Sequence, residues 1–190
     1  MANPQDRHLG IALCVEGKTD IAVYSTLIRR MSPNFSIDLE TRYFRGYSRM
    51  LHSLEHVLSE LRDSNIDIFV VLADNDRNPT NKRYQAIQII CQNEAMDAAI
   101  GIAVEAMEAW LLADEGGLSF VKGSTVNRLP SPERIRHPDR KILEILSYRK
   151  RNISLSDALK AVIANSSLDI LGSRCRSFRR FNSEYKRRLP

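Results

Sequence analysis

The sequence predicts an α/β domain in which a mainly parallel, four-stranded sheet forms the middle of three layers. Short apolar segments alternate four times with segments whose apolar residues recur at helical spacing. The predicted strands are apolar on both faces, which is typical of a parallel sheet that helices cover on both sides. After residue 115 no further strand is indicated, and the remaining chain has the pattern of helices.

The alternating segments divide the chain into elements with recognisable ends. Helices are expected after Gly17, around Met50 to Leu61, and from about Arg83 to Asn93, because apolar residues recur there every three to four positions. We therefore expect an α/β domain at residues 1–115, and a helical C-terminal extension at residues 116–190 that packs on the same core and ends in a basic tail. The expected strands are Ile11 to Val15, Ile37 to Phe44, Ile66 to Ala73 and Ala98 to Val104.

Local signals place helix ends in the C-terminal extension. Ser131-Pro132-Glu133 predicts a helix start with proline in the first turn, and Ser154 with Asp157 forms a pair that resembles a capping box. Near the C-terminus, apolar residues recur at spacings of three and four and are expected to face the core. These residues are Phe178, Phe181, Tyr185 and Leu189.

Composition restricts the class of protein. The 190 residues are 43% hydrophobic and carry a formal net charge of +5, which suits a globular domain with an acidic partner. No apolar run is long enough for a membrane helix and the N-terminus lacks a signal peptide, so we expect a cytoplasmic protein without a membrane partner. The three cysteines have no metal-ligand spacing and are expected to be buried thiols.

Acidic residues follow two of the predicted strands. Glu16 comes directly after the first strand, and Asp74 and Asp76 follow the third. If these strands are neighbours in a parallel sheet, the carboxylates meet at one edge, where a divalent cation would relieve their repulsion. An all-oxygen ligand set favours Mg²⁺ or Mn²⁺ over zinc. Glu105 and Glu108 follow the fourth strand on one helical face and could complete a second metal site.

Each of these acids also has a purely structural interpretation. Asp74-Asn75-Asp76 is a common turn and helix-capping sequence. Glu16 lies where the dipole of the following helix favours an acid, and the same holds for Glu105 beside a solvated Glu108. The two strand-end features together are more specific than either one alone.

Three segments carry a family resemblance: VEGKTD from Val15, DNDR from Asp74 and EAMEAWLLAD from Glu105. The chain resembles the Toprim superfamily of topoisomerases, primases and nucleases, and more narrowly a bacterial family of Toprim-like proteins of unknown function. The resemblance implies a Rossmann-like fold and a nuclease-like magnesium site, with Glu16 as general acid/base or metal ligand and Asp74 and Asp76 as metal ligands. Topoisomerases carry a third acid where this chain has Asn78, which argues against strand passage.

Basic residues supply candidate nucleic-acid contacts. Lys18 and Arg77 lie beside the acidic motifs and are candidates for phosphate contacts, or for surface ion pairs. The basic tail could follow a phosphate backbone, or form a solvated helix face. Its candidate residues are Arg176, Arg179, Arg180, Lys186, Arg187 and Arg188.

The sequence thus favours an Mg²⁺-dependent (or Mn²⁺-dependent) endonuclease-type hydrolase that binds DNA or RNA. Analogy with related nucleases extends this to phage defence or DNA repair, with an ATPase partner. The alternative is a non-catalytic nucleic-acid-binding or regulatory module of the same fold. A P-loop-like NTPase is a minor alternative suggested by Gly17-Lys18-Thr19, although the full motif would need glycine where Ala12 stands.

Overall fold

The chain folds around a parallel β-sheet with helices on both faces, as the sequence predicted. The computed structural model describes residues 7–76, 82–146 and 154–190. Within these ranges four parallel strands form one sheet in the order β2-β1-β3-β4, so β1 and β3 are neighbours, as hypothesised. The strands are β1 (His8–Val15), β2 (Ser36–Tyr43), β3 (Ile68–Asp74) and β4 (Ala98–Ala103).

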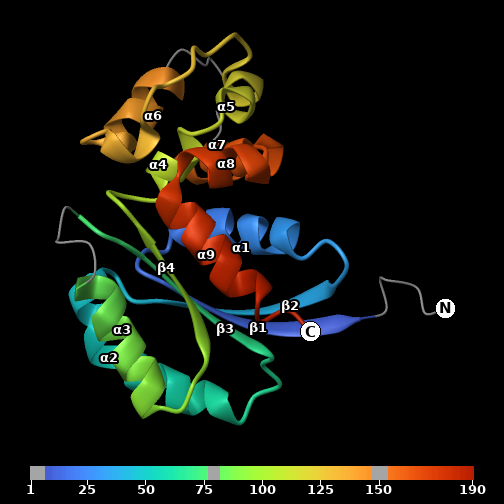
Figure 1. Ribbon diagram of the computed structural model, residues 1–190, viewed down its shortest axis with the longest axis vertical. Coiled ribbons are helices and arrows are strands. Elements are labelled where there is room, and N and C mark those ends of the chain that lie inside the picture. Colours follow the sequence, from blue (N-terminus) through green and yellow to red (C-terminus); the bar gives the residue numbers. More distant parts are fainter. Residues whose placement is uncertain (1–6, 77–81, 147–153) are drawn as a thin grey trace.

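Helices cover both faces of this sheet (Figure 1). Helices α2 and α3 lie on one face, α1 and α9 lie on the other, and the remaining helices extend beyond α1 and α9. Their bounds are α1 (Asp20–Met31), α2 (Tyr47–Arg62), α3 (Lys82–Asn93), α4 (Glu108–Leu111), α5 (Glu115–Lys122), α6 (Pro138–Leu146), α7 (Leu155–Asn165), α8 (Leu168–Arg174) and α9 (Arg176–Lys186).

The two faces of the sheet belong to two separate apolar clusters. Successive side chains of a strand point to opposite faces, so Leu13 and Val15 of β1 pack with α1 and the C-terminal helices, whereas Ala12 and Cys14 pack with α2 and α3. All four are buried. Burial on both faces explains why β1, β3 and β4 read as continuous apolar runs. The edge strand β2 differs, because its residues alternate between exposed and partly buried.

Helix α9 packs against the edge strand β4, which joins the C-terminal helices to the core of the sheet. Phe178, Phe181 and Tyr185 are fully buried, which confirms their predicted core role. The ring of Phe181 stacks on Trp110 with centroids 6.0 Å apart. Gly101 of β4 permits this approach, because a Cβ there would lie 2.9 Å from Phe181 Cδ2.

The predicted helix ends are partly confirmed. Ser154 Oγ accepts the N–H of Asp157 at 3.1 Å and begins α7, as expected. The helix start predicted at Ser131 is instead a single 3-10 turn, Pro132–Arg134, because Ile135 returns to an extended conformation. All three cysteines are buried. Among the described residues, no helix has the length and apolar character needed to cross a membrane.

Candidate acid site

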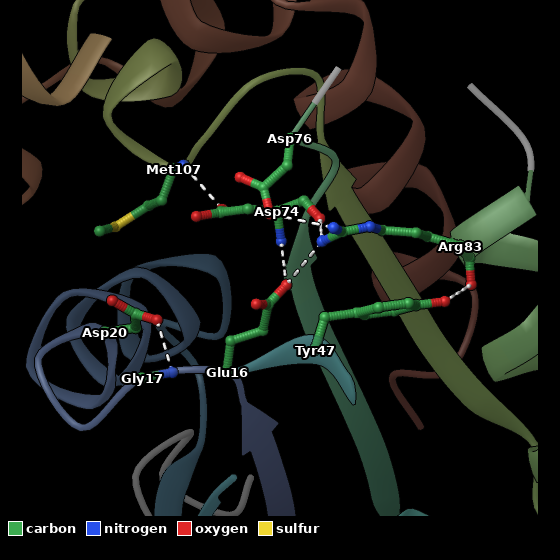
Figure 2. Close-up of polar contacts among 8 residues, drawn as sticks. All are labelled: Glu16, Gly17, Asp20, Tyr47, Asp74, Asp76, Arg83 and Met107. Carbon is green, nitrogen blue, oxygen red and sulfur yellow. Dashed lines mark hydrogen bonds and ion pairs between the residues drawn. The ribbon is translucent and has the colours of Figure 1, made fainter. Parts of the chain in front are cut away.

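The ends of β1 and β3 bring two of the predicted acids together. Glu16 follows the last residue of β1, and its Oε1 accepts the backbone N–H of Asp74 at 2.8 Å (Figure 2). The bond crosses directly between neighbouring parallel strands, whose carboxyl ends lie at the same edge of the sheet. Glu16 and Asp74 therefore lie side by side at the carboxyl edge of the sheet, as the strand ends predicted.

Asp74 links β3 to the segment that follows β4. Its Oδ1 accepts the N–H of Met107 at 2.9 Å, which leaves the carboxyl group facing other acids. Burial raises the pKa of Asp74 well above its ordinary value, and the negative charges of Glu108, Asp20 and Glu16 raise it further. Among the described acids, the ionised Asp74 carboxylate is therefore the one that burial and neighbouring negative charges disfavour most clearly.

Asp76 occupies a tight turn beyond the strand end. Its φ of 44° is in the left-handed region, which aspartate tolerates better than most residues. Its N–H donates to the carbonyl of Glu105 at 3.2 Å, so the turn continues the pairing of β3 with β4. The side chain of Asp76 is 62% exposed and pairs with Arg83, as Oδ2 lies 2.9 Å from Nη2.

Arg83, at the start of α3, is a site residue that the sequence did not identify. Its Nη1 lies 3.3 Å from Glu16 Oε1 and also donates to the Asp74 carbonyl, so one guanidinium joins all three acidic positions (Figure 2). The group stacks over the ring of Tyr47 at 4.1 Å from its centroid. The only sequence signal was an arginine following the acidic loop at a helix start.

Asp20 also belongs to the acid site and was not predicted. Its Oδ2 accepts the N–H of Gly17 at 2.9 Å, and a Cβ at Gly17 would stand equally close to that oxygen. Burial raises the pKa values of Asp20 and Glu108, and the Glu108 carboxyl additionally feels the charges of Asp20 and Asp139. The available signal in the sequence was the four-residue spacing between Glu16 and Asp20. At this spacing the first turn of the helix can bring Asp20 back toward the end of β1.

The hydroxyl of Tyr24 is close enough to these acids for their charges to act on it. It is buried and has no hydrogen-bond partner among the described residues. Burial raises its pKa well above the ordinary value, and the charges of Asp74, Asp20, Glu108 and Glu16 act in the same direction. The hydroxyl therefore keeps its proton at neutral pH, among carboxylates.

An acidic pocket of about 530 Å³ opens over Asp74 and Asp76. Both glutamates predicted for a second metal site, Glu105 and Glu108, line it, whereas Glu16 does not. The complete lining is Asp74, Asp76, Glu105, Ala106, Glu108, Arg136, His137, Pro138 and Asp139.

The acidic pocket has the donors that a hard divalent cation prefers. Carboxylate oxygens that repel one another in a half-buried site are stabilised when such an ion neutralises them. Within the described ranges, however, no group of three or more His, Cys, Asp or Glu side chains is arranged to hold a metal ion. The carboxylate oxygens of the pocket are ligands that suit Mg²⁺ or Mn²⁺. In this structure, however, the Asp76 carboxylate pairs with Arg83.

The predicted basic residues are distributed over several places. Arg176 and Arg180 lie beside the acid site, where they line a second pocket of about 350 Å³ together with Asn75, Tyr84 and Ile102. Lys18 is exposed in the turn after β1, and Arg77 lies outside the described residues.

The other basic positions of the tail are not among the residues that line this pocket. Arg188 pairs with Asp97, just before β4, at the opposite end of the sheet from the acids. Arg179, Lys186 and Arg187 are exposed. Only the first turn and a half of α9 therefore brings cations near the acid site.

These features define a parallel α/β protein with an acidic pocket at the carboxyl edge of its sheet. A family model described as "Domain of unknown function (DUF4276)" matches residues 15–184, and the chain belongs to that family. The match includes every acid of the site. Searches among curated proteins and among solved structures gave no match.

Proposed function

We propose that this chain is a metal-dependent nucleic-acid phosphodiesterase of the Toprim type. The observation that carries the proposal is the bond from the Asp74 N–H to Glu16, which joins the ends of two neighbouring parallel strands at 2.8 Å. A strand-end glutamate beside an Asp-x-Asp turn is the arrangement that the Toprim resemblance implies.

Asp74, Asp76 and Glu108 are the residues proposed to hold Mg²⁺ or Mn²⁺, because they line the acidic pocket. Glu105, from the same pocket, is proposed to contribute to a second ion. A bound ion would polarise a phosphate oxygen and lower the pKa of water. Glu16 is proposed as a general acid/base, since burial raises the pKa of its carboxyl above the ordinary value.

The second pocket gives the proposed substrate a path. It adjoins the acid site through Asn75, and it combines the guanidinium groups of Arg176 and Arg180 with apolar side chains of β4. The carboxylate of Glu133 lines it as well, and Arg180 also pairs with Glu184. A nucleic-acid strand offers phosphates to the guanidinium groups and base surfaces to the apolar side chains. An ATPase partner is proposed only by analogy with nucleases that act beside ATPases.

The test is cleavage by the purified protein in Mg²⁺ or Mn²⁺, with supercoiled, linear and single-stranded DNA and with RNA. We expect cleavage that EDTA, Asp74→Asn and Asp76→Asn each abolish. Asp38→Asn is the matched control, because Asp38 is exposed on β2, away from the acid site. Cleavage that persists in Asp74→Asn would contradict the proposal.

A non-catalytic nucleic-acid-binding module is the second candidate. The observation in its favour is that Arg83 already pairs with both Glu16 and Asp76 and compensates part of their charge. In that case the protein would bind nucleic acid without cutting it, and binding would be unchanged in Asp74→Asn. Filter-binding assays in EDTA and in Mg²⁺ distinguish the two candidates.

A further inference from the structure

The guanidinium of Arg83 occupies a position that determines how the acids share charge. Only 10% of its side chain is exposed, and the Tyr47 ring supports one face. One nitrogen lies 3.3 Å from Glu16 and the other lies 2.9 Å from Asp76, so the cation stands between the two carboxylates. Arginine keeps its charge at every relevant pH, so this compensation is permanent while the contacts last.

The same contacts divide the acids into two groups. Glu16 and Asp76 have a cation, whereas Asp74 faces the negative charges of Glu108 and Asp20. A divalent ion in the acidic pocket would bring compensation to Asp74. For Asp76 to become a second ligand, the divalent ion would have to compete with Arg83 for the Asp76 carboxylate.

The two ion pairs of Arg83 differ in how easily they can exchange. Asp76 is 62% exposed and lines the acidic pocket, so its side chain can turn to an ion at little cost in desolvation. Glu16 is 14% exposed and is held by the Asp74 N–H, so its pair with Arg83 is the more persistent one. Exchange is therefore expected at Asp76.

We propose that Arg83 is the built-in counter-cation of the acid site, and that a divalent ion binds by taking Asp76 from it. The proposal rests on the proposed function, because it assumes that the pocket binds an ion. It makes Arg83 a positioning residue that weakens ion binding while it stabilises the ion-free protein. A merely structural arginine would affect folding alone.

The test is isothermal titration calorimetry with MnCl₂ on Arg83→Met, Arg83→Gln and Arg83→Lys, each compared with the unmodified chain. Removing the competing charge is expected to tighten Mn²⁺ binding by on the order of tenfold in Arg83→Met and Arg83→Gln. Arg83→Lys keeps the charge but loses the planar two-pronged contact and the stacking on Tyr47, so Mn²⁺ binding is expected to tighten less than in the two neutral variants. If Arg83→Met does not fold, Arg83→Gln and Arg83→Lys still give the comparison.

Arg62→Met is the matched control. Arg62 also pairs with a carboxylate and a backbone carbonyl, both of Glu94, but it lies at the end of α2 away from the acid site. Its loss should leave Mn²⁺ affinity unchanged. Melting curves in EDTA should show Arg83→Met and Arg83→Gln melting lower than the unmodified chain, with a larger upward shift on adding Mn²⁺.

The outcomes separate this inference from the proposed function. If the unmodified chain binds Mn²⁺ and both neutral variants bind it equally or more weakly, the counter-cation role is wrong while the metal site stands. If the unmodified chain binds no Mn²⁺ at millimolar concentration, both proposals fail. Tighter binding in the neutral variants alone supports the counter-cation.

Discussion

Glu16→Ala should destabilise the metal-free protein as well as remove activity. The side chain is 14% exposed and accepts hydrogen bonds from the Asp74 N–H and from Arg83. Losing a hydrogen bond to a charged acceptor costs about 1.5–3 kcal/mol, and the partly uncompensated Arg83 adds about 1 kcal/mol more. For a chain of this size a loss of about 3 kcal/mol lowers the melting temperature by roughly 6–12 °C.

Thermal unfolding in EDTA measures this effect without any contribution from metal. Glu16→Gln keeps an oxygen that can accept the Asp74 N–H and removes a charge that burial disfavours, so we expect a smaller loss than in Glu16→Ala. Glu40→Ala is the control, because Glu40 forms an exposed pair with Arg42 that should be worth less than about 1 kcal/mol. A Glu16→Ala variant that melts with the unmodified chain would refute the proposed link between the strand ends.

Three other measurements test the charges and the packing. Folding raises the pKa of Asp74, so the folded protein favours the protonated carboxyl. The free energy of unfolding is therefore not reduced by Asp74 below its pKa in the unfolded chain, near 4, and it falls as pH rises toward the raised pKa of the folded state. In urea unfolding without metal, Asp74→Asn should therefore be more stable than the unmodified chain at pH 8 and lose that advantage by about pH 4; an advantage that grows on acidification would contradict this sign. Tyr24→Phe removes a buried hydroxyl without a partner among the described residues and should stabilise the metal-free protein by about 1 kcal/mol, whereas a clear loss would mean that the hydroxyl is paired. Gly101→Ala should cost about 1–3 kcal/mol, because its Cβ would lie 2.4 Å from Leu72 Cδ2, and an unchanged urea midpoint would show that the Leu72 side chain can move aside.

The part of the site that sequence could predict is the part that follows from strand order. Once β1 and β3 are neighbours, residues at their carboxyl ends must be close, and Glu16 meets Asp74 for that reason. Arg83 could not be found in this way, because its position depends on how α3 returns after the acidic turn. No local sequence pattern predicts that the Arg83 guanidinium contacts residues at the ends of both β1 and β3.

The C-terminal extension shows the same limit. The aromatic spacing of α9 predicted its buried face, since periodicity is a local property. The sequence showed a single basic tail, but α9 runs along β4. Arg176 therefore lines the pocket beside the acid site, while Arg188 reaches Asp97 at the other end of the sheet. At Ser131 the capping pattern was present without an apolar stripe to extend it, and the helix ends after one turn.

Electron paramagnetic resonance of Mn²⁺ tests the central claim most directly, because the signal of free Mn²⁺ falls as the ion binds. We expect saturable binding to the unmodified chain, little binding to Asp74→Asn, and unchanged binding to Asp38→Asn. Equal binding to the unmodified chain and Asp74→Asn, or no saturable binding at all, would contradict a metal site at the carboxyl edge of the sheet.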